Sequence, residues 1–340
     1  MQRNRTTTIK QIAGKLGVHP STVSRALNPQ TRHLIGDVTR ERIERAAKVA
    51  GFFPNAVAAS LRTGRSKLIG VFLPDISNTV FSPILKGVAE VLTGEGFATI
   101  VADLGQTEGT DPSMVFELVS RRVEGVILAT VSRNDKLVER CLANGLPVVL
   151  VNRAEGQIRA SSVTSDDIQG MRMAMDHLCG LGHRRIGHLA GPQTLSTGFL
   201  RKRGFREAAE AWSLSPEATP VVECQSYSRE AGAVAMKALL DVRRDLTAIA
   251  VANDLLALGA YEALGHAGLK VPDDVSVVGH NDMPLIDLVN PPMTTIRINH
   301  RDLGREAACL LMNEIKDNAV ARRSIILAPE LVVRASTRAV

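Results

Sequence analysis

Aromatic residues make up only 3% of the 340 residues, and there is a single tryptophan, so extended stacking surfaces are scarce. Cysteine is also rare. The cysteines lie far apart and none belongs to a Cys-x-x-Cys pair, which favours scattered buried thiols in a reducing compartment over a disulfide framework. They are Cys141, Cys179, Cys224 and Cys309. No apolar run is long enough to span a membrane, and the first ten residues lack the apolar core of a signal peptide. We therefore expect a cytoplasmic protein.

The motifs that mark common enzyme classes are also missing. No Gly-x-Gly-x-x-Gly follows an expected strand, and there is no Gly-x-Ser-x-Gly nucleophile elbow. His177, His183 and His188 do not have the His-Glu-x-x-His spacing of a zinc site, and the neighbouring Arg184 and Arg185 would repel a cation. The sequence therefore predicts a protein that is not an enzyme and that uses no cofactor and no metal ion.

The chain is large enough for two or three domains, since 45% of its residues are hydrophobic and 22% are charged. Its charge is distributed unevenly. Residues 1–66 contain 12 Lys and Arg against 3 Asp and Glu, a net of +9, so the chain's total of +6 leaves about −3 for the remainder. A basic head on a mildly acidic body is typical of a protein whose head binds a polyanion.

The stretch 8–28 has the pattern of two short helices joined by a tight turn. Thr8 opens a Thr-x-x-Gln capping box, and Gly17 ends the first helix through a left-handed residue. Pro20 suits the first position of the second helix, which we expect to run to about residue 27. Its outer face carries hydroxyls and an arginine, groups that bind phosphate oxygens and guanine. The pattern predicts a helix-turn-helix whose second helix recognises DNA.

The string Gly-Val-x-Pro-x-Thr-Val-Ser-Arg-Ala-Leu-Asn over residues 17–28 resembles the DNA-binding signature of the LacI/GalR family of bacterial repressors. One departure is His19, where the family usually has Ser or Thr as the N-cap. Because imidazole is a poorer cap, we expect the entry to this helix to be less firmly fixed. Further segments that resemble the family lie at 178–186, 190–192, 251–254, 271–279, 291–295 and 329–337.

The resemblance implies DNA contacts from the head and from a hinge helix that follows it. The expected DNA-binding residues are Thr8, Pro20, Ser21, Thr22, Ser24, Arg25, Asn28, Asn55 and Leu61. Leu61 falls where the family places a leucine that wedges between base pairs in the minor groove. The alternative for residues 54–64 is a plain linker, because so short a helix is marginal in water. A third helix is expected over 39–50, with Asp37 as its cap.

From residue 67 onward, short apolar runs alternate with amphipathic helical stretches, which is typical of parallel sheets covered on both faces. The expected strands are 68–73, 98–102, 125–129, 148–151, 186–190, 248–252 and 275–278. The expected helices are 84–92, 135–143, 171–181, 201–211, 230–240 and 255–267. So many strands predict two doubly wound lobes with a ligand cleft between them, at the carboxyl ends of the strands.

The body is similar to periplasmic sugar-binding proteins, whose chain crosses between the lobes three times. We expect the crossings near residues 162–166, 290–295 and 326–329. The predicted domains are a helix-turn-helix domain at 1–53, a hinge or linker at 54–66, and an effector-binding and dimerisation domain at 67–340. The first lobe is expected at about 67–163 and 296–326, and the second at about 164–290 and 327–340. The dimer interface is expected at 80–92 and in the helix after His300.

Family positions carried over one at a time imply an effector site between the lobes. The expected residues are Asp75, Phe81, Thr130, Asn152, Arg153, Arg201, Tyr227, Asn253 and Asn281. Where most members have Gly-aromatic-Asp-Asp, this chain has His280 and Asn281 after the glycine. The amide removes one negative charge, and His280 is taken to add a positive one. Since Arg pairs strongly with carboxylates, one hypothesis is an acidic effector, a sugar acid or phosphosugar. The other is a neutral sugar, with Asn281 only packing a loop.

These features together predict an α/β protein with a helix-turn-helix head and a two-lobed body like that of periplasmic binding proteins. The expected function is a transcriptional regulator, a repressor, that binds operator DNA as a homodimer under the control of a sugar or sugar-acid effector. The alternative is a solute-binding protein without DNA-binding activity. The basic head and the missing signal peptide argue against it. The sequence does not decide whether the effector releases the DNA or promotes its binding.

Overall fold

A computed structural model describes residues 7–28, 31–52, 64–105, 117, 120–317 and 319–340. The chain divides into two compact units, a head at residues 1–66 and a body at residues 67–340. Residues 54–63 of the predicted hinge, with Asn55 and Leu61, lie outside the described residues.

The head contains the two predicted helices of the helix-turn-helix and a third helix. They are α1 (Ile9–Leu16), α2 (Pro20–Ala26) and α3 (Asp37–Val49), with a short 3-10 helix η1 (Arg32–Leu34) before α3. The predicted capping box is confirmed, because the Thr8 side chain accepts from the Gln11 backbone while the Gln11 side chain accepts from the Thr8 backbone. Gly17 ends α1 with φ 68°, as predicted. The small core consists of Ile12, Ala13, Val23, Ala26, Ile43 and Ala47.

One expectation about helix ends in the head needs correction. His19 is the N-cap of α2, since its Nδ1 accepts a hydrogen bond from the Ser21 backbone N–H at 3.2 Å. Asp37 is not the cap of α3. It is the first helical residue, after Gly36, and its carboxylate pairs with Arg40 at 2.7 Å. An acidic residue in the first turn still favours the helix through its dipole.

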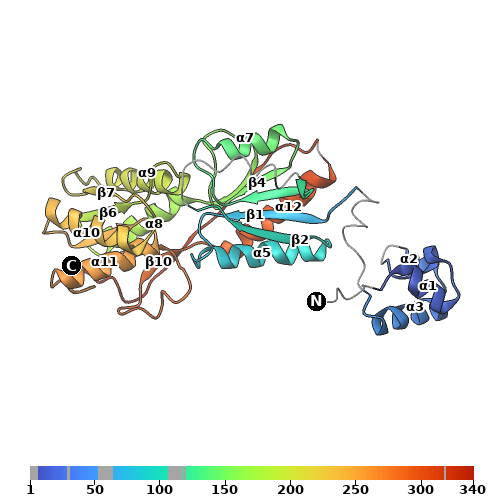
Figure 1. The fold of residues 1–340 in the computed structure, drawn as a ribbon. Helices are drawn as coiled ribbons and strands as arrows, with labels where there is room; N and C mark the ends of the chain where they lie inside the picture. Colours follow the sequence, from blue (N-terminus) through green and yellow to red (C-terminus); the bar gives the residue numbers. More distant parts are fainter. Residues whose placement is uncertain (1–6, 29–30, 53–63, 106–116, 118–119, 318) are drawn as a thin grey trace. The chain divides into compact units, whose positions relative to one another are not determined.

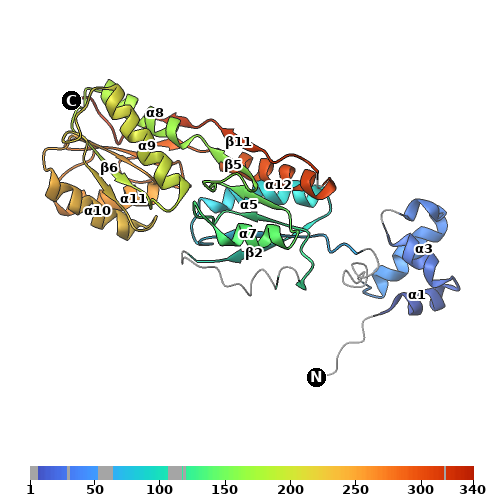
Figure 2. The ribbon, with the colours of Figure 1, turned by 90° about the horizontal axis from the view of Figure 1, so that it is seen from above.

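The body contains two six-stranded sheets, as the predicted doubly wound lobes require (Figures 1 and 2). The first sheet, in lobe 1, has the order β11-β5-β4-β3-β1-β2, and the second, in lobe 2, has the order β12-β10-β9-β8-β6-β7. Lobe 1 contains β1 (Leu68–Leu73), β2 (Ala98–Asp103), β3 (Gly125–Leu128), β4 (Val148–Val151), β5 (Ser161–Ser165) and β11 (Ser324–Leu327). Lobe 2 contains β6 (Ile186–Ala190), β7 (Val221–Glu223), β8 (Ala248–Val251), β9 (Ser276–Asn281), β10 (Thr294–Arg297) and β12 (Glu330–Val332). The strands are parallel apart from β12, which is antiparallel to β10.

Helices cover both faces of each sheet, because the central strands are apolar on both sides. In lobe 1, α5 (Phe81–Gly94) and α12 (His300–Lys316) share one core with the sheet, and α7 (Lys136–Ala143) packs near the core on the other face. In lobe 2, α10 (Arg229–Val242) and α11 (Asp254–His266) cover one face, and α8 (Asp167–Gly180) and α9 (Ser196–Ala211) cover the other.

The helices α5 and α12 approach each other unusually closely. A Cβ atom on Gly87 would lie 2.0 Å from the Arg301 carbonyl oxygen, so this contact requires glycine. Cys309, on α12, is exposed, whereas the other three cysteines are buried, so the prediction of buried thiols is wrong at this position.

The chain crosses between the lobes three times, but the second crossing lies later than expected. Residues 294–297 form β10, which pairs with β9 in the second sheet, and α12 then begins at His300 in lobe 1. The crossing therefore follows Arg297 instead of falling within 290–295. Its cause is the β-branched segment at 294–296, which is fully buried and extends the sheet.

Candidate effector and DNA-binding sites

The second helix of the head, α2, carries the side chains proposed to bind DNA. Ser21 and Arg25 are exposed on it, so both are free to contact a ligand. Pro20, Thr22, Ser24 and Asn28 are half-buried and are therefore less exposed than predicted. Thr8 is exposed at the start of α1, where its hydroxyl lies 3.3 Å from the Gln11 side-chain oxygen.

His19 and Ser21 are linked by two contacts. The Ser21 hydroxyl lies 2.8 Å from His19 Nδ1, which also accepts the Ser21 backbone N–H. When Nδ1 accepts both, the hydroxyl proton is directed to His19 while the oxygen keeps its lone pairs. The departure at His19 thus orients a neighbouring residue that the sequence predicts to contact DNA, as well as capping the helix.

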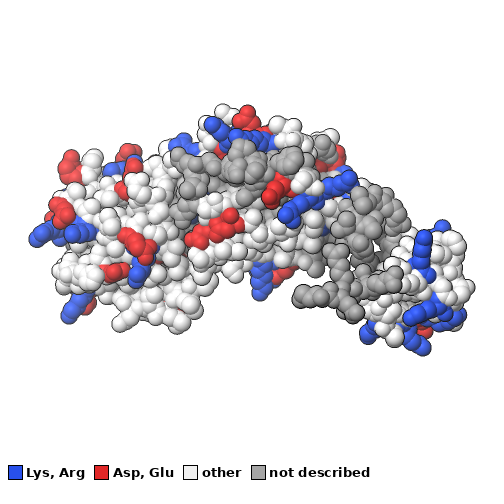
Figure 3. All heavy atoms as spheres, viewed as in Figure 1, with Lys and Arg blue, Asp and Glu red and all other residues white. Residues whose placement is uncertain are grey.

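Lys and Arg side chains predominate on the head. On the face drawn in Figure 3 they are spread over α1–α3, and acidic residues are few there. Together with the net of +9 over residues 1–66, this gives the head the potential expected of a surface that meets a phosphate backbone.

In the body, the loops after β3 and β4 of lobe 1 meet the loop after β6 of lobe 2. The Arg133 backbone N–H donates to the Thr194 carbonyl at 2.9 Å, and the Ala154 N–H donates to Ser196 Oγ at 3.0 Å. The Arg133 guanidinium also stacks over the Phe199 ring, 3.8 Å from its centroid. These contacts bring the carboxyl ends of the two sheets together, where a ligand of such a fold is expected.

Lobe 1 contributes four of the predicted polar residues, all just after strand ends. Asp75 follows β1, and its carboxylate accepts from the Ser77 hydroxyl at 2.6 Å. Thr130 and Asn152 follow the neighbouring strands β3 and β4, and Thr130 Oγ1 is buried without a hydrogen-bond partner. Arg153 is 8% exposed, and its Nε is likewise buried without a partner. Phe81, by contrast, is 3% exposed within the core of lobe 1.

In lobe 2, Arg201 projects from α9 and is held by two contacts. Its Nε donates to Asp167 Oδ1 at 2.7 Å, and its Nη1 donates to the Ala252 carbonyl at 2.6 Å. Both charged side chains are 3% exposed. The Asp167 carboxylate therefore offsets the positive charge that Arg201 was expected to present to a ligand. Sequence reasoning missed Asp167, because the strand before it has no apolar run and its pairing with Arg201 depends on tertiary packing.

Three further predicted residues of lobe 2 are buried here. The Tyr227 hydroxyl donates to Thr197 Oγ1 at 3.1 Å, and Asn253 caps α11 by accepting from the Leu256 N–H at 3.1 Å. Asn281 ends β9 with φ 120°, a conformation that L-residues rarely adopt. Such a backbone at a strand end points to a constrained site.

The expectation that His280 adds positive charge is wrong. His280 is completely buried, and burial, followed by the charge of Arg201, lowers its pKa well below the usual value, so the ring is neutral. A Cβ atom on Gly170 would lie 2.7 Å from its Cε1, so the glycine makes room for the ring. His300, at the start of α12, is also buried, and burial lowers its pKa to about 3. Both rings are therefore neutral.

This arrangement suits recognition of a small polar molecule. Among the residues that the structure describes, the buried side-chain nitrogens and oxygens without partners are Thr130 Oγ1, Arg153 Nε, both ring nitrogens of His280, His300 Nε2 and His188 Nε2. Buried polar groups are normally hydrogen-bonded, so Thr130 Oγ1 and Arg153 Nε, which follow neighbouring strands, indicate a ligand or water at that edge of the sheet. Among the described residues, no group of His, Cys, Asp and Glu is placed to hold a metal ion.

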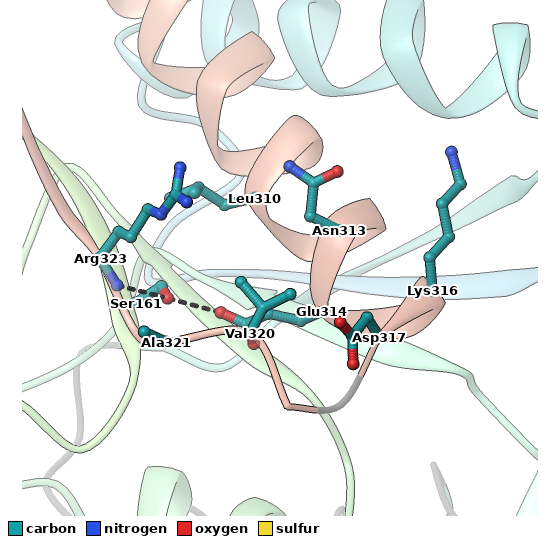
Figure 4. A pocket seen from close by; sticks show the side chains of 9 residues that line it. All are labelled: Ser161, Leu310, Asn313, Glu314, Lys316, Asp317, Val320, Ala321 and Arg323. Carbon is teal, nitrogen blue, oxygen red and sulfur yellow. Dashed lines mark hydrogen bonds between the residues drawn. The ribbon is translucent and has the colours of Figure 1, made fainter.

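A separate hollow of about 230 Å³ lies in lobe 1 beside the end of α12 and the starts of β5 and β11 (Figure 4). Its lining includes Ser161 and Glu314, which are hydrogen-bonded to each other. Burial raises the pKa of Glu314. This hollow is smaller than the ~300 Å³ of a typical small-molecule site, and it lies at the opposite end of the strands from Arg153. It is therefore not part of the candidate effector site.

Comparison with known proteins extends over almost the whole chain. Residues 8–55 match the model of bacterial regulatory proteins of the lacI family, and residues 175–337 match the periplasmic binding protein-like domain. The regulator MalR of Streptomyces coelicolor is 34% identical over 340 residues, covering 98% of this chain and 97% of its own.

Two solved structures resemble the chain along nearly its full length. The lac repressor dimer bound to operator and the anti-inducer ONPF has a TM-score of 0.87 at 28% identity, with 98% of this chain and 100% of that chain covered. The complex of the regulator CelR with cellobiose has a TM-score of 0.74 at 30% identity, with 97% and 99% covered. These matches confirm the predicted fold class, and the relatives are transcriptional regulators and not enzymes. Because they include the head, they decide against a solute-binding protein without DNA-binding activity. No helix among the described residues is long and apolar enough to cross a membrane.

Proposed function

The chain belongs to the LacI family of bacterial regulatory proteins and is a DNA-binding transcriptional regulator, and from this premise we propose that it is a repressor controlled by a small effector bound between its lobes. The observation that carries the effector part is the pair of buried polar atoms without partners, Thr130 Oγ1 and Arg153 Nε, just after the carboxyl ends of β3 and β4. The site of action is the cytoplasm, where bacterial operator DNA lies.

The DNA part of the proposal assigns roles to exposed and half-buried side chains of the head. Ser21, Thr22, Ser24 and Asn28, with Thr8 at the start of α1, bind phosphates, and Pro20, Ser21 and Arg25 face the bases. Arg25 is exposed in the last turn of α2, and a bidentate Arg–guanine pair discriminates by ~1–3 kcal/mol against other bases. In the hinge, Asn55 contacts DNA and Leu61 wedges into the minor groove.

The regulator acts as a homodimer that reads a near-palindromic operator, because two-fold protein symmetry is mirrored in the half-sites. The partner surfaces are the outer faces of α5 and α12. The exposed Arg301 on α12 forms an ion pair with Glu90 on α5 at 2.7 Å within the chain, so this ion pair links the two helices that form the surface. We keep the domain division of 1–53, 54–66 and 67–340. The second crossing between the lobes is placed after Arg297.

The effector is a sugar or a sugar acid that binds Asp75, Thr130, Asn152, Arg153, Asn253 and Asn281, with the buried Phe81 and Tyr227 supporting the site and Arg201 behind them. CelR, a regulator of the same family, forms a complex with cellobiose, which supports a sugar-like ligand. The effector controls DNA binding only to the extent that it binds the two lobe arrangements with different affinities.

Two measurements on the full chain test the proposal. Electrophoretic mobility shift with duplexes selected from a random pool should give specific complexes whose affinity falls steeply with salt, because phosphate contacts release counterions. Thermal shift with sugars, sugar acids and phosphosugars should give a ligand that raises the melting temperature and changes operator affinity. Specific DNA binding that no stabilising ligand alters would refute effector control, and no specific DNA binding would refute the repressor assignment.

A further inference from the structure

Two buried arginines lie at the meeting point of the lobes, but their surroundings differ. Arg201, on α9, has an internal counter-ion, since its Nε donates to Asp167 at 2.7 Å and its Nη1 donates to the Ala252 carbonyl. Because buried ion pairs are largely self-compensating, Arg201 offers a ligand little net positive charge.

Arg153, at the end of β4, has no such partner. Its guanidinium forms no hydrogen bond or ion pair with any other residue that the structure describes, and its Nε is fully buried and unpartnered. Burial lowers the pKa of Arg153 to about 10, and the like charge of Arg201 contributes to the shift, so the side chain remains protonated at neutral pH. A buried charge without a partner is costly, and such charges are normally paired.

The groups around Arg153 cannot supply the missing negative charge. Tyr227 is uncharged at neutral pH, since burial raises the pKa of its phenol. Thr130, which follows the strand next to Arg153's own, carries a second unpartnered buried atom, Oγ1. One charged donor beside neutral polar atoms forms a site for a molecule with a single anionic group and hydroxyls.

We propose that Arg153, and not Arg201, is the anchor for an anionic group of the effector, a carboxylate or phosphate on a polyhydroxylated molecule. This inference rests on the proposed function, because it places the ligand in the same interlobe site. It narrows the choice between neutral and acidic effectors to the acidic class, and it gives Arg201 the structural role of joining α8 and α9 through Asp167.

The stability of the ligand-free protein gives a first test. Arg153→Gln removes an uncompensated buried charge, so the ligand-free variant should melt at or above the wild-type temperature. Arg201→Gln leaves Asp167 unpaired and should melt lower. If Arg153→Gln lowers the melting temperature as much as Arg201→Gln does, the charge has a partner within the protein and the proposal is overturned.

The second test measures ligand binding by thermal shift and isothermal titration on the full chain at constant ionic strength. The probes are the matched pairs glucose and glucuronate, galactose and galacturonate, and glucose and glucose 6-phosphate, with acetate and inorganic phosphate as simple anions. At least one acid should bind wild type more tightly than its neutral partner. Arg153→Gln should weaken that acid by roughly 10- to 100-fold and leave the neutral partner nearly unchanged, with Arg153→Lys intermediate. Arg172→Gln, which alters an exposed arginine of α8, is the matched control and should change neither.

The carboxylate and phosphate probes distinguish the two sources of the anion. Preference for a neutral sugar overturns the anchor but keeps the proposed function. The proposal that Arg153 is the anchor is also overturned if no anion stabilises wild type more than it stabilises Arg153→Gln. This outcome does not depend on the result for operator binding. Mobility shift on the same preparations tests the DNA-binding function separately, so failure of one proposal is not confused with failure of the other.

Discussion

Breaking the Arg201–Asp167 ion pair should strongly destabilise lobe 2. The Nε–Oδ1 distance is 2.7 Å and both side chains are 3% exposed. Removal of Asp167 therefore leaves a buried guanidinium without its partner, and removal of Arg201 leaves a buried carboxyl whose pKa is raised by burial. Loss of one member of a buried pair typically costs ~3–5 kcal/mol. We therefore expect Asp167→Ala and Arg201→Met each to reduce the free energy of unfolding of this lobe by about that amount.

The double variant should lose much less than the sum of the two single losses. Once one charge has been removed, removing the other relieves the unpaired partner, so the coupling energy should be at least ~2 kcal/mol. Losses that add within ~0.5 kcal/mol would refute this reasoning, because they would mean that the two charges act independently.

The chain provides its own probe for this experiment. Trp212 is the single tryptophan, and it lies directly after α9, where its indole Nε1 donates to Asp176 on α8 at 2.7 Å. Its fluorescence during urea unfolding therefore reports separation of the two helices that the ion pair joins. Arg172→Ala is a matched control, because Arg172 joins the same helices through Glu207 at 2.5 Å but is half exposed. It should cost no more than about 1 kcal/mol.

Three further changes test other parts of the structure. Thr8→Ala removes the capping box and should destabilise the head by ~1 kcal/mol in urea unfolding followed by circular dichroism, and no loss would show that the cap contributes nothing. Burial raises the pKa of Asp254 from 3.8 to about 6, so its charged form opposes folding, and its contribution should improve by up to ~3 kcal/mol as the pH falls from 7 to 4. Asp254→Asn should remove that part of the pH dependence, and a parallel wild-type and variant profile by Trp212 fluorescence would contradict it. Arg133→Ala removes the stacking on Phe199 that joins the lobes, and it should increase the radius of gyration in small-angle X-ray scattering of the ligand-free protein; an unchanged radius would deny the contact a role in closure.

Much of the fold was predictable because the decisive signals are local. The runs at 68–73, 148–151 and 186–190 are strands with the predicted bounds, since each is a short apolar segment between helices. The strands β5 and β11 were missed for a physical reason. β5 is mostly serine and threonine, and β11 lies at the edge of its sheet with alternating exposure, so neither has the apolar run that marks a buried strand.

The chemistry of the site was less predictable than its location. Position after strand ends correctly brought Thr130, Asn152 and Arg153 to one edge of the sheet. Two facts depended on tertiary packing and had no local signal. Arg201 meets an acid 34 residues away in sequence, and His280 is sealed beneath a glycine and is therefore neutral. Charge counted from sequence alone thus overestimated the positive charge available to a ligand.

The most direct test of the central claim is a selection of duplexes from a random DNA pool by the full chain, repeated with Arg25→Ala. The account predicts a near-palindromic consensus from wild type, with preference lost at one position in each half-site for the variant. An equal loss of affinity for all sequences would show that Arg25 contacts only phosphate. No enriched sequence from wild type would contradict operator recognition by this head.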